Sequence, residues 1–313
     1  MQICILAQYV SPMDIPDLVK ENNYADKSRW ATAIDWALLG IGIAFAVIGI
    51  IFFFAYNWAQ LHPFAKLGLM QALIVLPVVG ILLFKPAELV RKLILTAASL
   101  LVGVLFAIFG QIYQTGADAY DFFLAWTLFV ALWTFTSNFA VLWLIFLTLL
   151  NTTIILYIEQ VGGEISFTST CILLFLINAA AGLLFKFMQL RQFADVPNWI
   201  VKITALAAAT CLTAALVHGI FEKEGVTLYT AVVLGLLTYG SGTWYALKSK
   251  SLYLLCLIAL SLIIIITAFI TRYTLDQHSE MTLLLVSLFI IVSVTFTVQR
   301  LIKLNKTWNE ISA

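Results

Sequence analysis

The sequence predicts an all-α integral membrane protein of about ten transmembrane helices. Of its 313 residues, 63% are hydrophobic and 11% are charged, and the mean hydropathy is +1.03. A soluble domain carries about 25% charged residues, so this chain lacks the polar surface of a soluble protein. Apolar runs recur along nearly the whole length, each long enough to cross a hydrocarbon core of roughly 30 Å as a helix. The runs are continuous rather than alternating, which excludes a membrane β-barrel.

Residues 1–33 precede the first apolar run and form a predicted cytosolic segment. Met1–Val10 is apolar but too short to span a membrane, and it lacks the basic start of a signal peptide. Asp14–Lys27 mixes acidic and basic residues, and we expect it to form a short amphipathic or surface helix. Both Met1 and Met13 remain candidate start residues.

Ten spans account for the apolar runs. The fourth is short for a membrane span, and it needs neighbouring helices or a locally thinner bilayer. Connections between the spans are brief, which leaves no room for a soluble domain after the N-terminal segment. The predicted spans are 34–56, 65–84, 93–113, 121–136, 139–158, 167–186, 198–219, 227–247, 251–271 and 281–299.

Lysine and arginine are strongly segregated between the two sides that these spans define. Because basic residues concentrate in cytoplasmic loops, the side with more of them is the cytosol. Both termini are therefore predicted to be cytoplasmic. The opposite side carries only Lys66, Lys223 and Arg272. The predicted cytoplasmic residues are Lys20, Lys27, Arg29, Lys85, Arg91, Lys92, Lys186, Arg191, Lys202, Lys248, Lys250, Arg300, Lys303 and Lys306.

The membrane region divides into two predicted halves, residues 34–158 and residues 159–313. Gly103-Val-Leu and Gly110-Gln-Ile-Tyr113 in the third span are echoed by Gly235-Leu-Leu and Gly242-Thr-Trp-Tyr245 in the eighth. Five spans per half would make the second half inverted, and inverted repeats with glycine-interrupted helices are a transporter architecture. Chance similarity in glycine-rich apolar sequence is the alternative.

Two helix ends carry the polar residues that set this chain apart. The first span ends in Asn57-Trp58, and the third ends in Gly110-Gln111-Ile-Tyr113 before Asp118. We predict a ligand-binding site on the outer side built from Asn57, Trp58, Gln111, Tyr113 and Asp118. The alternative is that the two amides only cap helix ends and bind interfacial water.

Small residues are spaced so that the first and third spans could pack closely together. Gly42, Ala46 and Gly49 form one stripe, and Gly103, Ala107 and Gly110 form the other. Small side chains let helix backbones approach, and van der Waals contact drives helix association in lipid. We therefore expect these two spans to be neighbours and to bring Asn57 and Gln111 to one level.

Three further amides lie deeper in predicted spans, at Gln71, Asn151 and Asn178. An amide in hydrocarbon needs a hydrogen-bonding partner. One interpretation is a polar pocket that opens outward between the first, second, third, fifth and sixth spans. The other is hydrogen bonding between helices for assembly, worth about 0.6 kcal/mol on average.

Metal and catalytic sites are not indicated. Cys4, Cys171, Cys211 and Cys256 show no metal-ligand spacing and fit small buried residues. An outward metal site could combine His62, His218 or His278 with Asp118, Glu222 or Asp276, but their spacing does not require one. No hydrolase, metalloprotease or phosphate-loop motif occurs. We expect no cofactor, and the sequence does not favour an enzyme.

The segment Ala55-Tyr-Asn57-Trp58 with Leu61 and Lys66, followed by Gly110-Gln-Ile-Tyr-Gln114 with Gly116 and Asp118, resembles a family of bacterial multi-pass membrane proteins. That family is known as a domain of unknown function. Its members begin with a short cytosolic helix, and several neighbour or fuse to proteins with a GDYxxLxY motif. The resemblance extends to about residue 150. It implies a bacterial cytoplasmic (inner) membrane and brings no activity with it.

Two functions follow as hypotheses. The first is a transporter or binder of a small uncharged or zwitterionic molecule at the outward site. The second is a structural or assembly partner of another membrane protein. An outer-leaflet enzyme is a third and weaker hypothesis. The expected partners are the lipid bilayer and such a membrane-protein partner; we expect no nucleic acid, and the oligomeric state is open.

Overall fold

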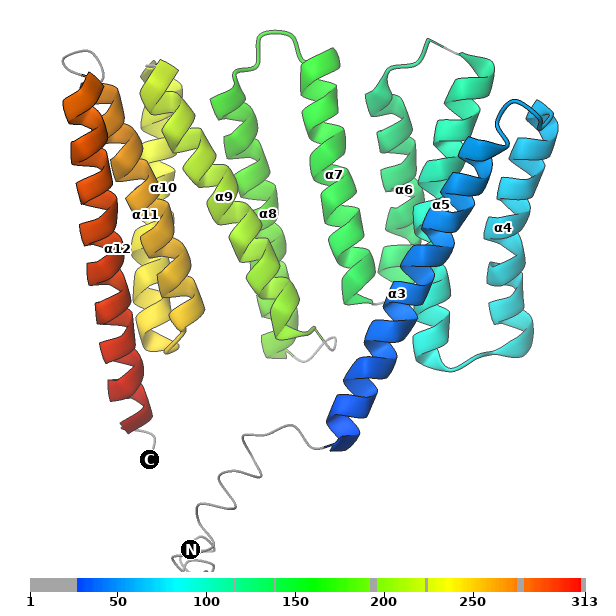
Figure 1. Ribbon diagram of the computed structural model, residues 1–313, viewed down its shortest axis with the longest axis horizontal. Coiled ribbons are helices and arrows are strands. Elements are labelled where there is room, and N and C mark those ends of the chain that lie inside the picture. Colours follow the sequence, from blue (N-terminus) through cyan, green and yellow to red (C-terminus); the bar gives the residue numbers. More distant parts are fainter. Residues whose placement is uncertain are drawn as a thin grey trace, which may run out of the picture. The chain divides into compact units, whose positions relative to one another are not determined.

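The computed structural model describes residues 27–114, 116–137, 139–191, 196–222, 225–274 and 279–310, and these residues form ten α-helices without any strand (Figure 1). The helices are α3 (Lys27–Tyr56), α4 (Pro63–Phe84), α5 (Glu88–Tyr113), α6 (Ala119–Ser137), α7 (Ala140–Gln160), α8 (Phe167–Arg191), α9 (Asn198–Glu222), α10 (Gly225–Lys248), α11 (Leu252–Thr274) and α12 (Ser279–Glu310).

All ten helices are long and apolar enough to cross a membrane, which confirms the predicted fold class. Each corresponds to one predicted span, and the differences lie at the ends. Helix α3 begins at Lys27 rather than at residue 34, α5 begins at Glu88 rather than at residue 93, and α12 continues to Glu310. The physical reason is that charged residues end an apolar run without ending a helix, because Lys, Arg and Glu are good helix formers.

The predicted surface helix at Asp14–Lys27 lies outside the described residues except for Lys27, which begins α3. The predicted inverted repeat stays a prediction, as does the division of the membrane region at residue 158.

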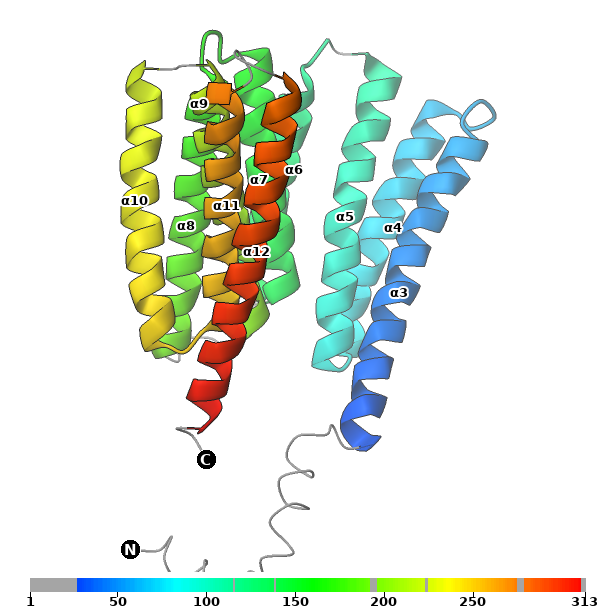
Figure 2. The ribbon, with the colours of Figure 1, turned by 60° about the vertical axis from the view of Figure 1, so that its left-hand side comes forward.

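The chain divides into two compact units, residues 1–117 and residues 118–313. Unit 1 contains α3, α4 and α5, and α5 contacts both of the others. The face of α3 that is covered within the unit carries Val47 and Phe54, which are about two helical turns apart. The C-terminal ends of α3 and α5 and the start of α4 lie at one end of this unit (Figures 1 and 2).

Unit 2 contains α6 to α12, and its core surrounds α9. Helix α9 contacts α8, α10 and α11, and it is the most buried of the ten spans. Leu212 and Ala215 of α9 are fully enclosed, and Phe175, Tyr239 and Ile258 pack around them from the neighbouring helices. A smaller cluster of Leu147, Phe185 and Ile200 joins α7, α8 and α9.

Three helices end at residues in the left-handed conformation that are not glycine. Lys85 follows α4 at φ 43°, Gln114 follows α5 at φ 43°, and Lys250 lies two residues after α10 at φ 52°. Glycine usually occupies such positions because it has no Cβ. At Gly162, after α7, glycine is required for space, since a Cβ there would lie 2.7 Å from the Ile158 Cα.

Close packing of helices at small residues occurs on different helices from those predicted. A Cβ added at Gly42 or Gly49 would meet nothing within 4 Å, so the predicted close approach at the α3 stripe is wrong even though α3 and α5 are neighbours. The close contacts lie in unit 2 instead. A Cβ at Gly219 of α9 would lie 3.0 Å from Leu228, and one at Gly235 of α10 would lie 3.1 Å from Leu216. The hydrophobicity pattern shows a small-residue stripe but not which neighbour it faces.

Candidate functional site

Asn57 organises the turn that joins α3 to α4. Its backbone N–H and its side-chain Nδ2 both donate to the Phe53 carbonyl oxygen, at 3.0 Å and 2.9 Å. Its own carbonyl oxygen accepts from the N–H groups of Gln60 and Leu61. Asn57 therefore ends α3 and holds the following turn. This is the helix-end role that the sequence left open as an alternative, and it leaves the side-chain oxygen of Asn57 with no hydrogen bond in the described residues.

Lys66 and Trp58 make the main side-chain contact of the same turn. The Lys66 ammonium lies 3.7 Å from the centroid of the Trp58 ring. Lys66 is only 6% exposed, although it belongs to the first turns of α4. Among the described residues no carboxylate forms an ion pair with it; the one ion pair found there joins Glu88 and Lys92. Its partner is thus the electron-rich ring face, an attraction worth about 2 kcal/mol when water is excluded.

His62 and Pro63 start α4. The His62 Nδ1 accepts a hydrogen bond from the Phe64 N–H at 3.3 Å, and its ring stacks on that of Phe64. Pro63 occupies the first helical turn, where its missing N–H removes no helical hydrogen bond. Hydrogen bonds among its own residues therefore hold the turn, and Lys66 packs against it through the Trp58 ring.

Gln111 and Tyr113 lie in the last turn of α5. Both side chains are exposed, and the Tyr113 ring packs against Phe109 at 4.6 Å between centroids. Gln114 then ends the helix in the left-handed conformation, and its N–H donates to the Gly110 carbonyl oxygen. Gln111 is free of hydrogen-bonded partners among the described side chains, so its amide is open at this end of unit 1.

Asp118 belongs to unit 2. It is exposed, and its carbonyl oxygen accepts from the Asp121 N–H at the start of α6. The structure therefore places four of the five predicted site residues, Asn57, Trp58, Gln111 and Tyr113, at one end of unit 1. Within the described part of the chain, no hydrogen bond joins any of the five side chains to another.

The deeper amides are paired with each other rather than open to a pocket. The Asn178 Nδ2 donates to the Asn151 Oδ1 at 2.9 Å, and the Asn151 Nδ2 donates to the Asn178 Oδ1 at 3.2 Å. Each Nδ2 also donates to a carbonyl oxygen of its own helix. Asn178 is 3% exposed. The pair therefore joins α7 to α8, which is the assembly role weighed for these two residues.

Gln71 differs from that pair because its side chain is exposed on α4. It lies eight residues after Pro63, or about 12 Å along the helix axis, well inside an apolar span. No hydrogen bond to it occurs among the described residues of unit 1.

Two of the three histidines have structural partners. His62 caps α4, and the His218 Nδ1 lies 3.0 Å from the Thr168 hydroxyl. His278 and Asp276 fall outside the described residues. In the described ranges, no three His, Cys, Asp or Glu side chains are grouped as metal ligands would be.

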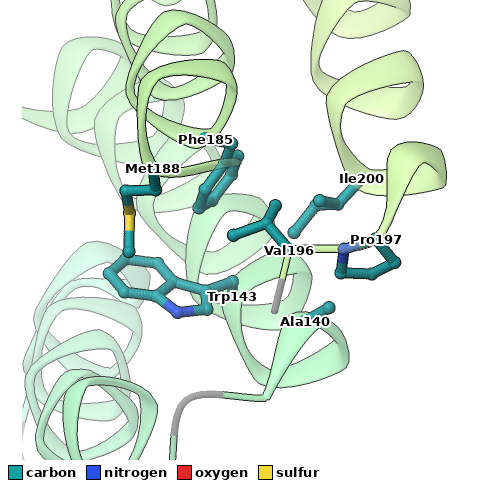
Figure 3. A pocket seen from close by; sticks show the side chains of 7 residues that line it. All are labelled: Ala140, Trp143, Phe185, Met188, Val196, Pro197 and Ile200. Carbon is teal, nitrogen blue, oxygen red and sulfur yellow. The ribbon is translucent and has the colours of Figure 1, made fainter. Parts of the chain in front are cut away.

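A small apolar hollow lies where the C-terminal end of α8 meets the starts of α7 and α9 (Figure 3). Its volume is about 10 Å³, enough for about one water molecule. Gln189 braces the nearby chain, because its Nε2 donates to the Val196 carbonyl oxygen and to the Asn198 Oδ1. The hollow is too small for a solute. Its lining residues are Ala140, Trp143, Phe185, Met188, Val196, Pro197 and Ile200.

Lys66 is the residue that the predicted site lacked. A signal for it exists in the sequence. It is one of three basic residues on the predicted outer side, and it lies near a helix N-terminus, where the helix dipole disfavours a positive charge. The contact with Trp58 could not be predicted, because it depends on how the turn between the helices folds back.

Comparison with known proteins shows that the first part of the chain is similar to one family. Residues 14–143 match the family described as "Predicted membrane protein (DUF2157)". The match covers fewer than half of the residues, from before α3 to the start of α7, and it includes all five predicted site residues. No curated protein and no solved structure matches the chain. Over residues 14–143 the chain is therefore similar to a membrane-protein family of unknown function, in agreement with the resemblance stated from the sequence.

Proposed function

We propose that the protein binds a small solute with a carboxylate or phosphate group at the end of unit 1 that carries the α3–α4 turn. In this proposal the turn faces outward from a bacterial cytoplasmic membrane and both termini lie in the cytosol, as the distribution of basic residues favours. Such binding is the first step of solute transport, the function class that we favour. The proposal uses residues of unit 1 only and leaves out Asp118.

The burial of Lys66 is the observation that carries this proposal. Taking an ammonium out of water costs several kcal/mol, and this is normally offset by an opposite charge. Lys66 is 94% buried and has the Trp58 ring but no carboxylate beside it in the described residues. The Lys66 Nζ is not among the fully enclosed side-chain atoms without a partner, so its ammonium reaches the surface and can meet a ligand there. The turn is therefore short of negative charge, and an anionic group on a ligand would supply it.

Neighbouring groups suit the rest of a small polar solute. The side-chain oxygen of Asn57 can accept a hydrogen bond, since only its Nδ2 is engaged. Gln111 presents an open amide at the same end of unit 1. A zwitterionic solute fits this combination, with its anionic group on Lys66 and its donors on amide oxygens. Of the two predicted ligand classes, uncharged and zwitterionic, the proposal therefore keeps the zwitterionic one, which bears an anionic group.

A Lys66→Met variant tests the proposal. We expect acetate, inorganic phosphate or glycine to raise the Tm of the purified wild-type protein above a sodium chloride control of equal ionic strength. A ligand at 100 times its Kd stabilises a protein by about 2.7 kcal/mol. The shift should vanish in Lys66→Met. Without a probe, this variant should be as stable as the wild type or more so, because replacing a buried charge by an apolar side chain is often neutral or stabilising by ~1–4 kcal/mol.

Lys85→Met is the matched control, since Lys85 lies at the opposite end of α4 and is exposed. It should keep the full response to the probe. The proposal is wrong if none of the three probes shifts the wild-type Tm, or if Lys66→Met responds as the wild type does.

Assembly with another membrane protein is the second candidate, and Gln71 favours it. In unit 2 the buried amides Asn151 and Asn178 satisfy each other, whereas Gln71 projects from an apolar helix without a partner in unit 1. An amide at that depth is expected to bond to a group outside the unit. The same purification distinguishes the candidates, because a second membrane protein in stoichiometric amount would favour assembly.

A further inference from the structure

The turn between α10 and α11 ends its helix with an unusual residue. The Ser251 N–H donates to the Ala246 carbonyl oxygen and the Lys250 N–H donates to that of Leu247. These two bonds form a Schellman motif, in which the residue at the position of Lys250 takes the left-handed conformation. Lys250 does so at φ 52°. Glycine is the usual residue there, so a lysine keeps a conformation that its Cβ disfavours. Lys85 and Gln114 end α4 and α5 in the same conformation, so what distinguishes the α10–α11 turn is the set of basic residues around it.

Tyr253 ties a second lysine to the same turn. Its hydroxyl donates to the Lys202 carbonyl oxygen on α9 at 2.8 Å, and the Lys202 ammonium lies 5.7 Å from the Tyr253 ring centroid. Tyr253 follows Lys250 by three residues, so Lys202 of α9 is held beside the start of α11. A third lysine, Lys248, ends α10 and lies over the Trp244 ring at 5.2 Å.

The three lysines are exposed and carry no counter-charge from the described residues. Their side chains form no ion pair there. The backbone N–H groups of the turn are already bonded within it, and the Ser249 hydroxyl donates to the Tyr245 carbonyl oxygen. A ligand at this turn would therefore be held by ammonium groups rather than by a backbone nest. That chemistry suits an anion with several oxygen atoms.

The depth of the turn identifies the anion. Trp244 lies four residues before Lys248 and Tyr253 lies three residues after Lys250, on the two helices that the turn connects. Tryptophan and tyrosine concentrate at the boundary between hydrocarbon and headgroups. Trp244 is 65% exposed, as a ring that faces lipid would be. In the predicted orientation the ammonium groups would lie at the level of lipid phosphates on the cytoplasmic side, where anionic lipids attract basic residues.

We propose that Lys202, Lys248 and Lys250 bind the phosphate of one anionic phospholipid at the cytoplasmic end of α9, α10 and α11. This site lies in unit 2 and is independent of the solute site proposed above. The general excess of lysine on that side accounts for the sign of the charge. It does not account for the contacts by which Tyr253 holds Lys202 of α9 beside the turn that carries Lys248 and Lys250.

Native mass spectrometry with phosphatidylglycerol tests the site. The protein is exchanged into mixed micelles of phosphatidylglycerol and phosphatidylcholine, and the retained lipids are counted. The variant K202Q/K248Q/K250Q should lose one tightly retained phosphatidylglycerol. Each lysine near a membrane surface contributes about 1 kcal/mol, so each single variant should weaken retention roughly fivefold. The matched control is R300Q/K303Q/K306Q on α12, which removes the same charge from the same predicted side and should retain that lipid.

Lys250→Gly separates the role of the side chain from folding. It should raise the Tm in phosphatidylcholine, because glycine relieves the left-handed strain, and it should weaken phosphatidylglycerol retention. Equal lipid loss in the α12 control, or undiminished retention in Lys250→Gly, would show that only diffuse charge attraction acts and would overturn the proposal. Inorganic phosphate that displaces the lipid at millimolar concentration would show a site for free phosphate and would overturn the lipid assignment.

Discussion

Replacing Asn178 by leucine should destabilise the protein by about 1–2 kcal/mol, while replacing both Asn151 and Asn178 should restore most of that loss. In the single variant the Asn151 Oδ1 loses the hydrogen bond that the Asn178 Nδ2 donates, and it then faces an apolar leucine side chain. Water cannot easily replace the lost donor, because position 178 is only 3% exposed. The double variant removes both polar groups and leaves an apolar contact between α7 and α8. Denaturant unfolding in mild detergent, arranged as a double-mutant cycle, measures the coupling.

Thr210→Val is a control for the Asn178 variant. Thr210 is exposed, and its hydroxyl bonds only to the Leu206 carbonyl oxygen of its own helix. Its replacement should have little effect. Additive losses in the double Asn variant would contradict the account, since they would mean that each amide bonds to a separate partner.

Gly219→Val should destabilise the protein by about 1–3 kcal/mol, whereas Gly49→Val should be close to neutral. A Cβ at Gly219 would lie 3.0 Å from the Leu228 Cδ1 and 3.7 Å from its Cα, so a branched side chain must displace the Leu228 side chain or move α10 away from α9. A Cβ at Gly49 would meet nothing within 4 Å. Both glycines are helical, Gly49 inside α3 and Gly219 in the last turn of α9. Thermal unfolding of both variants in one detergent gives the comparison.

Equal destabilisation by the two valines would contradict the assignment of close helix packing to unit 2. It would indicate instead that the glycine stripe of α3 is covered.

The spans were predictable because the hydrocarbon core sets one physical requirement, a helix of about 20 apolar residues. The ends of the helices were harder to predict. The helix beginning at Lys27 and the continuation of α12 to Glu310 run through charged residues that a hydropathy window counts as loop. Which helices pack closely was not predictable either. Gly49 and Gly219 have similar sequence surroundings, and only the fold shows that the second faces a neighbour.

Asn57 and Trp58 could be selected from sequence because an amide and an indole at a span end are conspicuous. The contacts that these two side chains make could not be predicted from the sequence. The fold directs the Asn57 amide back onto Phe53 and the Trp58 ring onto Lys66. The pairing of Asn151 with Asn178 depends on the register of α7 against α8, which periodicity does not give.

Both proposed sites depend on the orientation of the chain, and cysteine labelling of membrane vesicles tests it most directly. Gln60→Cys reports on the α3–α4 turn and Ser249→Cys on the α10–α11 turn; each is placed in a background in which Cys4, Cys171, Cys211 and Cys256 are replaced by alanine. In right-side-out vesicles, a membrane-impermeant maleimide should label Cys at 60 at once and Cys at 249 only after permeabilisation. Labelling of 249 but not 60 in sealed vesicles, or of both alike, would contradict the account.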